Sequence, residues 1–433
     1  MMNGNKHSLD VYLGKSVIAQ LRLVNDALHW HYTQSWLESG YPVSPHLPLN
    51  GEIPVLNVQR FLRNLLPEGA GFEEVLHTFH LSKYNTFGLV SALGLDIPGS
   101  LIVLAPEQSL PDKAAFRIIT DAELEQRLDN RDAFSLIIWD AKPRLSVAGV
   151  QDKINIMLDP DGQPGFGEGR LCSTYLLKFE KQKLSHLVLN EYTTMKLAEQ
   201  CGLKVANISL KRYGNHPALL IERFDRHFVS MNEVKRRHII DGCQALNLAP
   251  EYKYERNFGS GRDVAHIRDG VSFIKLFDFA NRCINPAVAK QQILDWALFN
   301  LLVFNFDAHG KNISFFIGQR GIELTPFYDL VNIKMYPEFD HQMAMALGDE
   351  FDADTIHAYQ LADFADSCSL NRGLVAQRLH VLIKKMRIAL KKDVLFLAVN
   401  EAENQYVITY KAMIQQRCED LMNEIEDIVR IDL

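Results

Sequence analysis

A short polar segment enclosed by apolar stretches constrains the fold of this chain more than any other feature. Residues 304–312 read Phe-Asn-Phe-Asp-Ala-His-Gly-Lys-Asn, and a Phe-Tyr-Asp run ends at Asp329. The residues between, 313–325, read as two short strands around a Gly-Gln-Arg-Gly turn. We therefore predict a hairpin that returns Asp329 to a position beside Asn312.

The polar residues of this segment match the needs of phosphoryl transfer from a nucleotide. The transferred group carries charge spread over three oxygens, so a site must supply metal ions and cations. Mg²⁺ prefers oxygen ligands, and Asn312 with Asp329 fits as a ligand pair. Asp307 is the predicted base for the attacking hydroxyl, and Lys311 is predicted to hold a phosphate oxygen. His309 is expected to brace the loop.

Each of these residues also has a simpler interpretation. A single Asp, His or Asn in a loop after a helix is usually a cap or a solvated turn residue. The combination of order, spacing and hairpin favours a metal-assisted phosphoryl-transfer site over that interpretation.

The composition is that of a folded globular protein. Hydrophobic residues make up 47% and charged residues 23% of the 433 positions, which argues against disorder. The N-terminus lacks an apolar signal core, and Asn300 and Asn305 interrupt the longest apolar run, so we expect a cytoplasmic protein. The six cysteines lie far apart without a CxxC pair and are expected to be reduced, buried thiols.

The charge distribution limits binding to nucleic acid. A net charge of -7 argues against extensive nucleic-acid binding, because neutralising phosphates needs clustered Lys and Arg. One helix-compatible stretch carries five cations and is a candidate for DNA contact: Lys384, Lys385, Arg387, Lys391 and Lys392. A solvated helix surface is the simpler alternative, and it is favoured for such a run by itself.

A small-residue loop in the first half of the chain is a candidate for phosphate binding. Residues 145–153 precede a predicted strand at 154–158, and small side chains let backbone amides approach phosphates. A strand predicted at 174–180 carries Lys178 near its end. This lysine becomes a candidate for the α- and β-phosphates if Glu191, on the following helix, positions it. An exposed strand lysine is the alternative.

The sequence predicts where the helix that carries Glu191 begins and ends, and it predicts two strands after that helix. We expect Asn190 to cap the helix and Gly202 to end it. Strands predicted at 208–210 and 218–221 lead into a Glu-Arg-Phe-Asp-Arg run. A strand that leaves into a polar linker resembles a kinase hinge, in which Asp225 can bind ribose hydroxyls. An Arg/Asp pair on the surface is an equally weighted interpretation.

The secondary-structure pattern predicts an α+β fold. In the first half, β-prone runs at 10–13 and 101–104 surround a helix at 55–66, and a helix at 121–130 is capped by Thr120. After residue 244 the pattern changes, and helical periodicity dominates from about Val271. Further helices are predicted at 287–304, with Asn285 as cap and Pro286 at its start, at 374–390 and at 394–429.

Several motifs of the chain resemble those of the HipA-type serine/threonine protein kinases, the toxins of bacterial HipBA modules. Asn-Leu-Leu-Pro-Glu-Gly at 64–69 resembles the motif of the family's N-terminal domain. Ser-Val-Ala-Gly-Val-Gln-Asp-Lys at 146–153 resembles its regulatory serine and phosphate-contacting loop. The most specific match is Asp-x-His-x-Lys-Asn at 307–312 with Leu-Thr-Pro-Phe-Tyr-Asp at 324–329, and no catalytic position is substituted.

The resemblance implies a kinase-like, two-lobed α+β fold with a mixed α/β N-terminal part and a mainly α-helical C-terminal part. The expected domains are an N-terminal α+β subdomain at 1–110, a nucleotide-binding subdomain at 111–245 and an α-helical catalytic domain at 246–433.

The resemblance also implies a role for each matched residue. Asp307 would be the catalytic base, Asn312 and Asp329 the Mg²⁺ ligands, and Ser146 the autophosphorylation site. In the family, phosphorylation of this serine expels its loop from the nucleotide site and silences the kinase. The implied ATP-binding residues are Val147, Ala148, Gly149, Gln151, Lys153, Lys178, Glu222, Phe224, Asp225, Gln244, His309 and Lys311. Of these, Lys178 would bind phosphate, Glu222 and Phe224 would flank the adenine, and Asp225 and Gln244 would contact the ribose.

The implied partners are ATP, Mg²⁺, a protein substrate and an antitoxin. Family members phosphorylate an aminoacyl-tRNA synthetase, often the glutamyl enzyme, and cause growth arrest and persistence. They also bind HipB, a small dimeric helix-turn-helix antitoxin, and join it on operator DNA to repress their own operon. The basic stretch at 384–392 would rest on DNA phosphates there, which implies a cytoplasmic protein that is nucleoid-associated in the repressor complex.

Two other functions compete with this interpretation. A small-molecule kinase shares the catalytic Asp, metal Asn and metal Asp, but the motif at 64–69 and the Ser146 loop argue against it. A catalytically silent corepressor would act only through HipB and DNA. The intact Asp307, Asn312 and Asp329 argue against that alternative.

Overall fold

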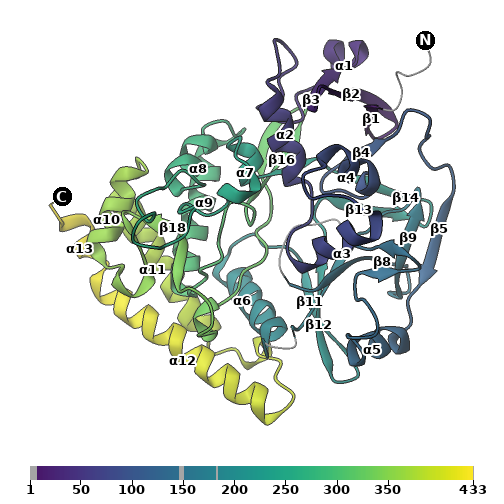
Figure 1. Ribbon diagram of the computed structural model, residues 1–433. Coiled ribbons are helices and arrows are strands. Elements are labelled where there is room, and N and C mark those ends of the chain that lie inside the picture. The colour runs from purple at the N-terminus through teal and green to yellow at the C-terminus, as the bar shows by residue number, and fades with distance from the viewer. Residues whose placement is uncertain (1–6, 146–150, 182–183, 433) are drawn as a thin grey trace. The chain divides into compact units, whose positions relative to one another are not determined.

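A computed structural model of the chain describes residues 7–145, 151–181 and 184–432. The chain forms two compact units, each built from discontinuous segments (Figure 1). Unit 1 comprises Met1–Lys181, Asn207–Pro250 and Phe315–Ile322, and unit 2 comprises Gln182–Ala206, Glu251–Ser314 and Glu323–Leu433. Helices and strands occur together, which confirms the predicted mixed α/β class, while the three consecutive domains stay a prediction.

Unit 1 begins with a four-stranded antiparallel sheet of order β3-β2-β1-β4. Its strands are β1 (Ser8–Leu13), β2 (Ser16–Val24), β3 (Ala27–Tyr32) and β4 (Leu101–Leu104). The associated helices are α1 (Gln34–Ser39), α2 (Val55–Asn64), α3 (Ala70–Phe79) and α4 (Thr86–Leu93). Trp30 of β3 packs edge-to-face on Phe61 of α2, with ring centroids 5.9 Å apart, so α2 covers this sheet. The strands and the helix predicted here are confirmed.

A six-stranded antiparallel sheet of order β11-β12-β10-β8-β9-β5 forms the second layer of unit 1. Its strands are β5 (Ala114–Ile118), β8 (Lys153–Leu158), β9 (Pro164–Gly169), β10 (Tyr175–Phe179), β11 (Ile208–Tyr213) and β12 (His216–Glu222). Because side chains alternate along a strand, Ile154, Leu177 and Leu220 lie on one face and join the core that contains Trp139. The opposite face carries the residues between them.

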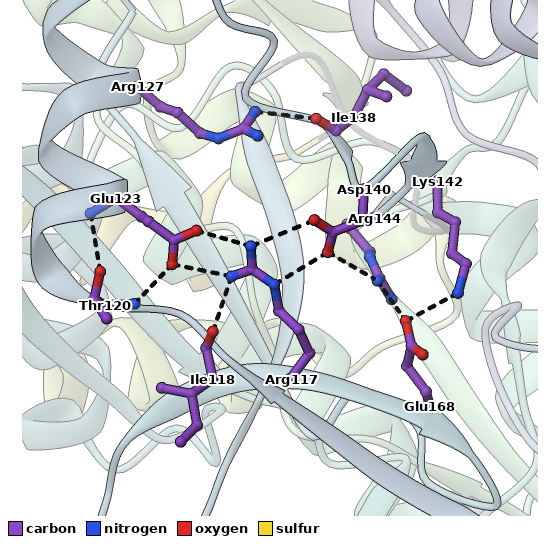
Figure 2. A network of polar contacts seen from close by, with 10 residues as sticks. All are labelled: Arg117, Ile118, Thr120, Glu123, Arg127, Ile138, Asp140, Lys142, Arg144 and Glu168. Atoms are coloured by element: carbon purple, nitrogen blue, oxygen red, sulfur yellow. Dashed lines mark hydrogen bonds and ion pairs between the residues drawn. The ribbon is translucent and has the colours of Figure 1, made fainter.

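Helix α5 (Asp121–Asp129) covers the core face of this sheet. The Thr120 cap predicted from the sequence is confirmed, and Glu123 completes a capping box with it. Figure 2 shows Arg117 of β5 between two carboxylates, 2.7 Å from Glu123 Oε1 and 3.1 Å from Asp140 Oδ2. Asp140 lies in the turn that joins β6 (Ile138–Trp139) to β7 (Lys142–Pro143). The network thus fixes that turn against the start of α5.

The rest of unit 1 surrounds the predicted hairpin. Its elements are β13 (Arg226–Ser230), β14 (Glu233–Arg236), β15 (Ile239–Asp241), α7 (Gly242–Ala245), β16 (Ser314–Gly318) and β17 (Gly321–Leu324). The hairpin of β16 and β17 is confirmed, and β15 extends it to a three-stranded sheet. Arg237 lies between β14 and β15, and its Cζ is 3.4 Å from the centroid of the Phe316 ring. This cation–π contact holds β16 against the segment that carries Arg237.

Unit 2 is mainly α-helical. Its elements are α6 (Leu187–Cys201), α8 (Phe273–Ala280), α9 (Pro286–Leu302), β18 (Gln342–Leu347), β19 (Glu350–Asp352), α10 (Ala358–Ser367), α11 (Arg372–Ala389), α12 (Glu401–Glu424) and α13 (Asp427–Arg430). Single 3₁₀ turns lie at Pro250–Tyr252, Ile333–Met335, Ala353–Thr355 and Asp393–Leu395. Helix α9 has the predicted Asn285 cap and Pro286 start.

Two helix predictions in unit 2 are wrong at their N-terminal ends. Residues 394–400 are not α-helical. Asp393–Leu395 forms a 3₁₀ turn, and Asn400 accepts the Glu403 N–H, which starts α12 at Glu401. Helix α6 begins after His186, and Asn190 lies inside it rather than capping it. The Asn190 side chain instead bonds to a distant part of unit 2. Gly202, with φ +91°, ends α6 as predicted.

The predicted burial of the cysteines is confirmed. All six cysteines are buried and none forms a disulfide. In the described part of the chain, no helix combines the length and apolar character that a membrane-spanning segment requires.

His238 makes the stability of unit 1 depend on pH. The ring is 2% exposed, and Nε2 lies 2.8 Å from Val43 O, a pure acceptor, so Nε2 carries the hydrogen. Nδ1 has no hydrogen-bond partner within the described residues. Burial lowers the pKa of His238 to about 4, against the opposing effects of the Val43 bond and the Asp225 charge.

We therefore expect unit 1 to lose stability between pH 6.5 and pH 4. Over this range the unfolded chain binds a proton that the folded chain excludes, so the free energy of unfolding falls as pH falls, by about 3 kcal/mol at most. Urea unfolding at pH 7 and pH 5 measures this slope. His238→Gln retains an amide donor without titrating, and its slope should be shallower than that of the wild type. Equal slopes would show that His238 is not responsible.

Candidate active site

Of the described catalytic, ATP-binding and metal-binding candidates, seven belong to unit 1 and five to unit 2. In unit 2 the polar loop is built on two buried asparagines. Asn305 Nδ2 donates to Asn300 Oδ1 at 3.0 Å, and Asn305 Oδ1 accepts the Asp307 N–H at 3.2 Å. Phe304 adopts φ +54°, a conformation that ends the helical path of α9. The loop conformation is therefore set before Asp307 is reached.

The loop holds Asn312 against the backbone of Asp307. His309 N–H donates to Asp307 O at 2.8 Å, and Asn312 N–H donates to His309 O at 2.9 Å. Asn312 Nδ2 also donates to Asp307 O, at 2.8 Å. Because the amide nitrogen is used in this way, the carbonyl oxygen of Asn312 is the end that can ligate a cation. The Asp307 side chain is 40% exposed and so remains accessible.

The hairpin returns Asp329 to this loop, as predicted. Tyr328 donates its hydroxyl hydrogen to Lys311 O at 2.7 Å, which joins the neighbours of the two predicted metal ligands. Thr325 N–H donates to Ser314 O at 3.0 Å at the base of the hairpin. Asp329 has φ +58°, in the left-handed region that aspartate adopts more readily than most residues.

The residues present fit a magnesium ion bound partly by water and phosphate. Asn312 presents an amide oxygen, and Asp329 supplies a carboxylate from the facing segment, so the two donors are the hard oxygens that Mg²⁺ requires. Within the described residues, no group of three or more His, Cys, Asp and Glu side chains could hold a metal by itself. A two-ligand site completed by nucleotide oxygens accords with this donor set.

Replacing Asp329 with asparagine is expected to weaken metal binding. The substitution keeps the shape and removes one negative charge, so the Mg²⁺ concentration for half-maximal phosphoryl transfer should rise about tenfold or more, since even outer-shell changes cost about 10–100-fold. A Mg²⁺ titration of ATP-dependent transfer measures this. Glu323→Gln, which removes a carboxylate from the same hairpin, is the matched control. An unchanged Mg²⁺ requirement in Asp329→Asn would contradict the assignment.

The structure adds Tyr254 to this group, and sequence reasoning missed it. Its hydroxyl donates to Asp307 Oδ1 at 2.5 Å, and its ring meets the His309 ring edge-to-face at 5.0 Å. His309 Nε2 lies 3.9 Å from the same carboxylate oxygen. No local pattern marks Tyr254, because 53 residues separate it from Asp307.

Asn190 was predicted to cap α6, but the structure gives it another role. Its Nδ2 donates to Asn332 O at 2.8 Å, and its Oδ1 accepts the Asn332 N–H at 2.7 Å. Helix α6 is thereby clamped to the backbone three residues after Asp329. Nδ2 also donates to the Tyr406 hydroxyl, which brings α12 into the same buried network. The i to i+4 spacing of Asn190 and Thr194 inside an apolar helix was the available signal.

In unit 1, two candidate lysines form a buried pair across strands. Lys153 of β8 lies directly opposite Lys178 of β10, so both side chains leave the same face of the sheet, and each is 4% exposed. This face is the one opposite the Trp139 core. The phosphate contacts predicted for these two lysines stay predictions. The alternative of an exposed strand lysine is wrong for Lys178.

The segment between β7 and β8 carries several predicted residues that lie outside the described part of the chain: Ser146, Val147, Ala148 and Gly149. Its two stems are fixed. Arg144 donates to Glu168 Oε1 at 2.7 Å (Figure 2), and its backbone bonds to Ile137 O. On the other side Gln151 Nε2 donates to Phe179 O at 3.1 Å, so the phosphate contact predicted for Gln151 stays a prediction.

The hinge residues follow β12 as expected. Glu222 Oε2 accepts a hydrogen bond from Asn207 Nδ2 at 2.9 Å, and the Phe224 ring meets Phe316 edge-to-face at 5.9 Å. Their contacts with adenine stay predictions. The edge-to-face pair fixes the path of the chain as it leaves the strand.

Asp225 forms a buried ion pair rather than the surface pair of the alternative interpretation. Its carboxylate accepts hydrogen bonds from Arg223 Nε and Nη2 at 3.0 and 2.8 Å and from Gly99 N–H at 2.9 Å. Arg226 Nη1 lies 3.2 Å from Asp225 Oδ2. Burial alone would raise the pKa of Asp225, but the two arginine charges outweigh it and hold that pKa well below its usual range. A ribose hydroxyl would have to share these oxygens.

Gln244 also has structural partners within unit 1. Its Oε1 accepts the Asp241 N–H at 3.0 Å, and its Nε2 donates to Phe61 O in α2 at 2.9 Å. Asn64, from the motif at 64–69, donates to Leu248 O at 2.8 Å. The two side chains join α2 to the segment around α7, and the ribose contact of Gln244 stays a prediction.

The five cations of the basic stretch are exposed, as the simpler interpretation expected. Lys385 Nζ donates to Cys201 O at 2.9 Å, at the C-terminal end of α6, where the helix dipole favours a cation. Lys392 Nζ bonds to Gln200 Oε1 at the same helix end. These two lysines therefore have a structural role, and DNA contact by the stretch stays a prediction.

The chain matches models of one protein family over most of its length. Residues 145–393 match the HipA-like C-terminal domain and residues 9–104 the HipA N-terminal domain. The serine/threonine-protein kinase toxin HipA of Shewanella oneidensis is 44% identical over 430 residues, or 98% of both chains. A relative from Sinorhizobium fredii is 31% identical over 81% of this chain and 83% of its own.

A solved structure has the same fold. The Shewanella oneidensis MR-1 HipA, determined in complex with HipB and operator DNA, matches with a TM-score of 0.91 and 43% identity over 98% of this chain and 100% of its own. Fold and relatives together define an enzyme of the serine/threonine protein kinase class, which implies the use of ATP. More narrowly, the chain belongs to the HipA family.

Proposed function

We propose that this chain is an ATP- and Mg²⁺-dependent serine/threonine protein kinase that acts as a toxin. The observation that carries the proposal is the loop in which the Asn312 side chain bonds to the backbone of Asp307 while Tyr328 bonds to Lys311 O. These contacts support a site that combines a base with two oxygen ligands. Hydroxyl phosphorylation needs that combination.

In this proposal each residue has one task. Asp307 accepts the proton of the attacking hydroxyl, and Asn312 with Asp329 holds a magnesium ion. The ion, when bound, neutralises charge on the phosphate oxygens. His309 keeps the loop in position, and Lys311, 6% exposed, supplies a fixed positive charge for a phosphate oxygen. In unit 1, the lysine pair formed by Lys153 and Lys178 binds nucleotide phosphates.

The proposed substrate is a protein of the translation apparatus. An aminoacyl-tRNA synthetase such as the glutamyl enzyme fits the family, and its phosphorylation would arrest growth and produce persistence. The proposed partner is a HipB-like dimeric antitoxin, with which the chain would bind operator DNA in the cytoplasm and repress its own operon. The related HipA determined with HipB and operator DNA supports this partnership.

The proposed off switch is autophosphorylation of Ser146. The stems beside this residue are anchored through Arg144 and Gln151, so phosphorylation would act on the short segment between fixed ends. A phosphate adds up to about two negative charges, which would oppose binding of ATP phosphates nearby.

Incubating the purified chain with labelled ATP and Mg²⁺ tests the proposal against a small-molecule kinase. The proposal predicts label on protein, including Ser146, and an increase in intact mass by whole phosphates. Label found only on an added metabolite would reject it. Ser146→Ala should remove one phosphate and leave transfer to other proteins intact.

A silent corepressor is the remaining alternative. It predicts DNA binding with HipB and no phosphate transfer by the wild-type chain. Measuring both properties on the same preparation separates the two, because the proposed kinase transfers phosphate and the corepressor does not.

A further inference from the structure

The segment that carries Asp329 is attached at its start to the residues that directly follow α6. Phe327 N–H donates to Lys204 O at 2.8 Å, and Ala206 N–H donates to Phe327 O at 2.8 Å. Both backbone groups of Phe327 are therefore used in bonds to one short stretch of chain. This end of the segment cannot shift unless the stretch after α6 shifts with it.

The other end of the segment is held by a buried side chain of α6 itself. Asn190 Nδ2 donates to Asn332 O at 2.8 Å, and Asn190 Oδ1 accepts the Asn332 N–H at 2.7 Å. An amide carries a donor and an acceptor side by side, so one side chain can pair with both backbone groups of one residue. Asn190 and Asn332 are each 0% exposed, so solvent does not compete for these bonds.

Between and beyond these two ends, the segment is joined to the loop that carries Asp307. The Tyr328 hydroxyl donates to Lys311 O at 2.7 Å. Ile333 N–H donates to Phe304 O at 3.0 Å, at the start of the loop. The two parts of the proposed metal site are thus held together by the same bonds that anchor them to unit 2.

The backbone conformation of Asp329 needs this support. Asp329 has φ +58°, and a residue with a side chain adopts this left-handed conformation less readily than a helical or extended one. Only two residues separate Asp329 from Asn332, which leaves little chain to absorb a shift of Asn332. Movement of Asn332 would therefore change the position of the Asp329 carboxylate relative to Asn312.

Asn190 also takes part in a network that does not involve the metal segment. Its Nδ2 donates to the Tyr406 hydroxyl at 2.6 Å, and the hydroxyls of Thr194 and Tyr410 lie 2.6 Å apart. These contacts hold α12 against α6 and stabilise unit 2. The bonds to Asn332 and the bonds to α12 are made by different groups, so substitutions can separate their effects.

We infer that Asn190 is a positioning residue for the metal site. Its amide fixes the backbone of Asn332 and so keeps the Asp329 carboxylate where it can bind a magnesium ion together with Asn312. Asn190 acts through the backbone of Asn332 and not on the ion itself. The inference rests on the proposed role of Asp329.

Metal binding without turnover tests the inference. Mn²⁺ replaces Mg²⁺, a non-hydrolysable ATP analogue replaces ATP, and electron paramagnetic resonance measures the Kd for Mn²⁺. Asn190→Ala removes both bonds to Asn332, and the Kd should rise about tenfold, the lower end of the effect of residues that orient metal ligands. Asn190→Ser keeps a hydroxyl that can replace one of the two bonds, so it should fold more stably and raise the Kd by a smaller factor.

Tyr410→Phe is the matched control, because it weakens the same buried network and leaves both bonds to Asn332 in place. Its melting temperature should fall, and its Kd for Mn²⁺ should equal that of the wild type. Hydrogen exchange measured by mass spectrometry gives a readout without metal. A peptide that spans residues 329–333 should exchange faster in Asn190→Ser than in the wild type, and at the wild-type rate in Tyr410→Phe.

A wild-type Kd for Mn²⁺ in a folded Asn190 variant, or an equal rise in Tyr410→Phe, would show that Asn190 only stabilises the fold. Asp329→Asn separates this inference from the proposed function. If Asp329→Asn weakens Mn²⁺ binding and Asn190→Ser does not, only the role of Asn190 fails. If Asp329→Asn binds Mn²⁺ as tightly as the wild type, Asp329 is not a metal ligand and both conclusions fail.

Discussion

Replacing Asp307 with asparagine is expected to lower the rate of phosphoryl transfer about 10²- to 10⁴-fold, because a general base contributes a factor of that size. Asparagine keeps the backbone carbonyl that accepts hydrogen bonds from His309 and Asn312. The loop should therefore keep its conformation, and the melting temperature should change little. Initial rates with labelled ATP and a serine-containing acceptor protein measure the loss.

The same change on an exposed residue controls for the general effect of losing a carboxylate. Asp278 lies exposed on α8, and Asp278→Asn should transfer phosphate at the wild-type rate. If Asp307→Asn retained more than about a tenth of the wild-type rate, the loss would be too small for a general base and the assignment of Asp307 would be wrong.

Replacing Asp225 with asparagine is expected to destabilise unit 1 by about 3–5 kcal/mol. The Asp225 carboxylate is 3% exposed and neutralises two buried guanidinium groups, those of Arg223 and Arg226. Without it, these charges stay buried with less compensation, and each must be desolvated on folding. The substitution is isosteric, so packing changes contribute little.

Urea unfolding without nucleotide measures this prediction. Three of the four tryptophans, Trp30, Trp36 and Trp139, belong to unit 1, so fluorescence reports mainly on that unit. Asp96→Asn is the matched control: its side chain is 30% exposed and it contacts the same Arg226. We expect it to cost about 1 kcal/mol or less. Equal effects of the two substitutions would contradict the special importance of Asp225.

The sequence predicted those features that depend on neighbouring residues. The hairpin of β16 and β17 follows from alternation around a Gly-flanked turn, and α5 and α9 follow from a Thr cap and an Asn-Pro start. The conformation of each is decided within a few residues, so local rules suffice. The same hairpin brings Tyr328, the residue before Asp329, to Lys311 O beside Asn312.

Features that depend on distant contacts were missed. Asn190 has the residue type of a helix cap, but its two bonds to the Asn332 backbone stabilise it inside α6, and His186 precedes the helix instead. Tyr254 lies beside Asp307 because the segment around it pairs with Gly310 and Val271. Tertiary bonds override local preference at both positions, and no short pattern encodes them.

The burial of individual side chains could not be predicted from the sequence either. A lysine at the end of a strand and an Arg-x-Asp run both occur commonly on surfaces, yet Lys178 and Asp225 are 4% and 3% exposed. Lys178 is buried because β10 lies inside a six-stranded sheet, which is decided by strand order and not by the strand itself. Asp225 lies three residues after β12 and is buried by its contacts with Gly99 and Arg226. Burial strengthens the electrostatic interactions of both residues.

The central claim is that the Asp307 loop phosphorylates a protein hydroxyl. Quantitative phosphoproteomics of cells expressing either the wild-type chain or Asp307→Asn, at equal levels, tests it most directly. The proposal predicts serine or threonine phosphorylation that rises only with the wild-type chain, on an aminoacyl-tRNA synthetase and on the chain itself. Identical phosphorylation sites and occupancies in the two samples would contradict it.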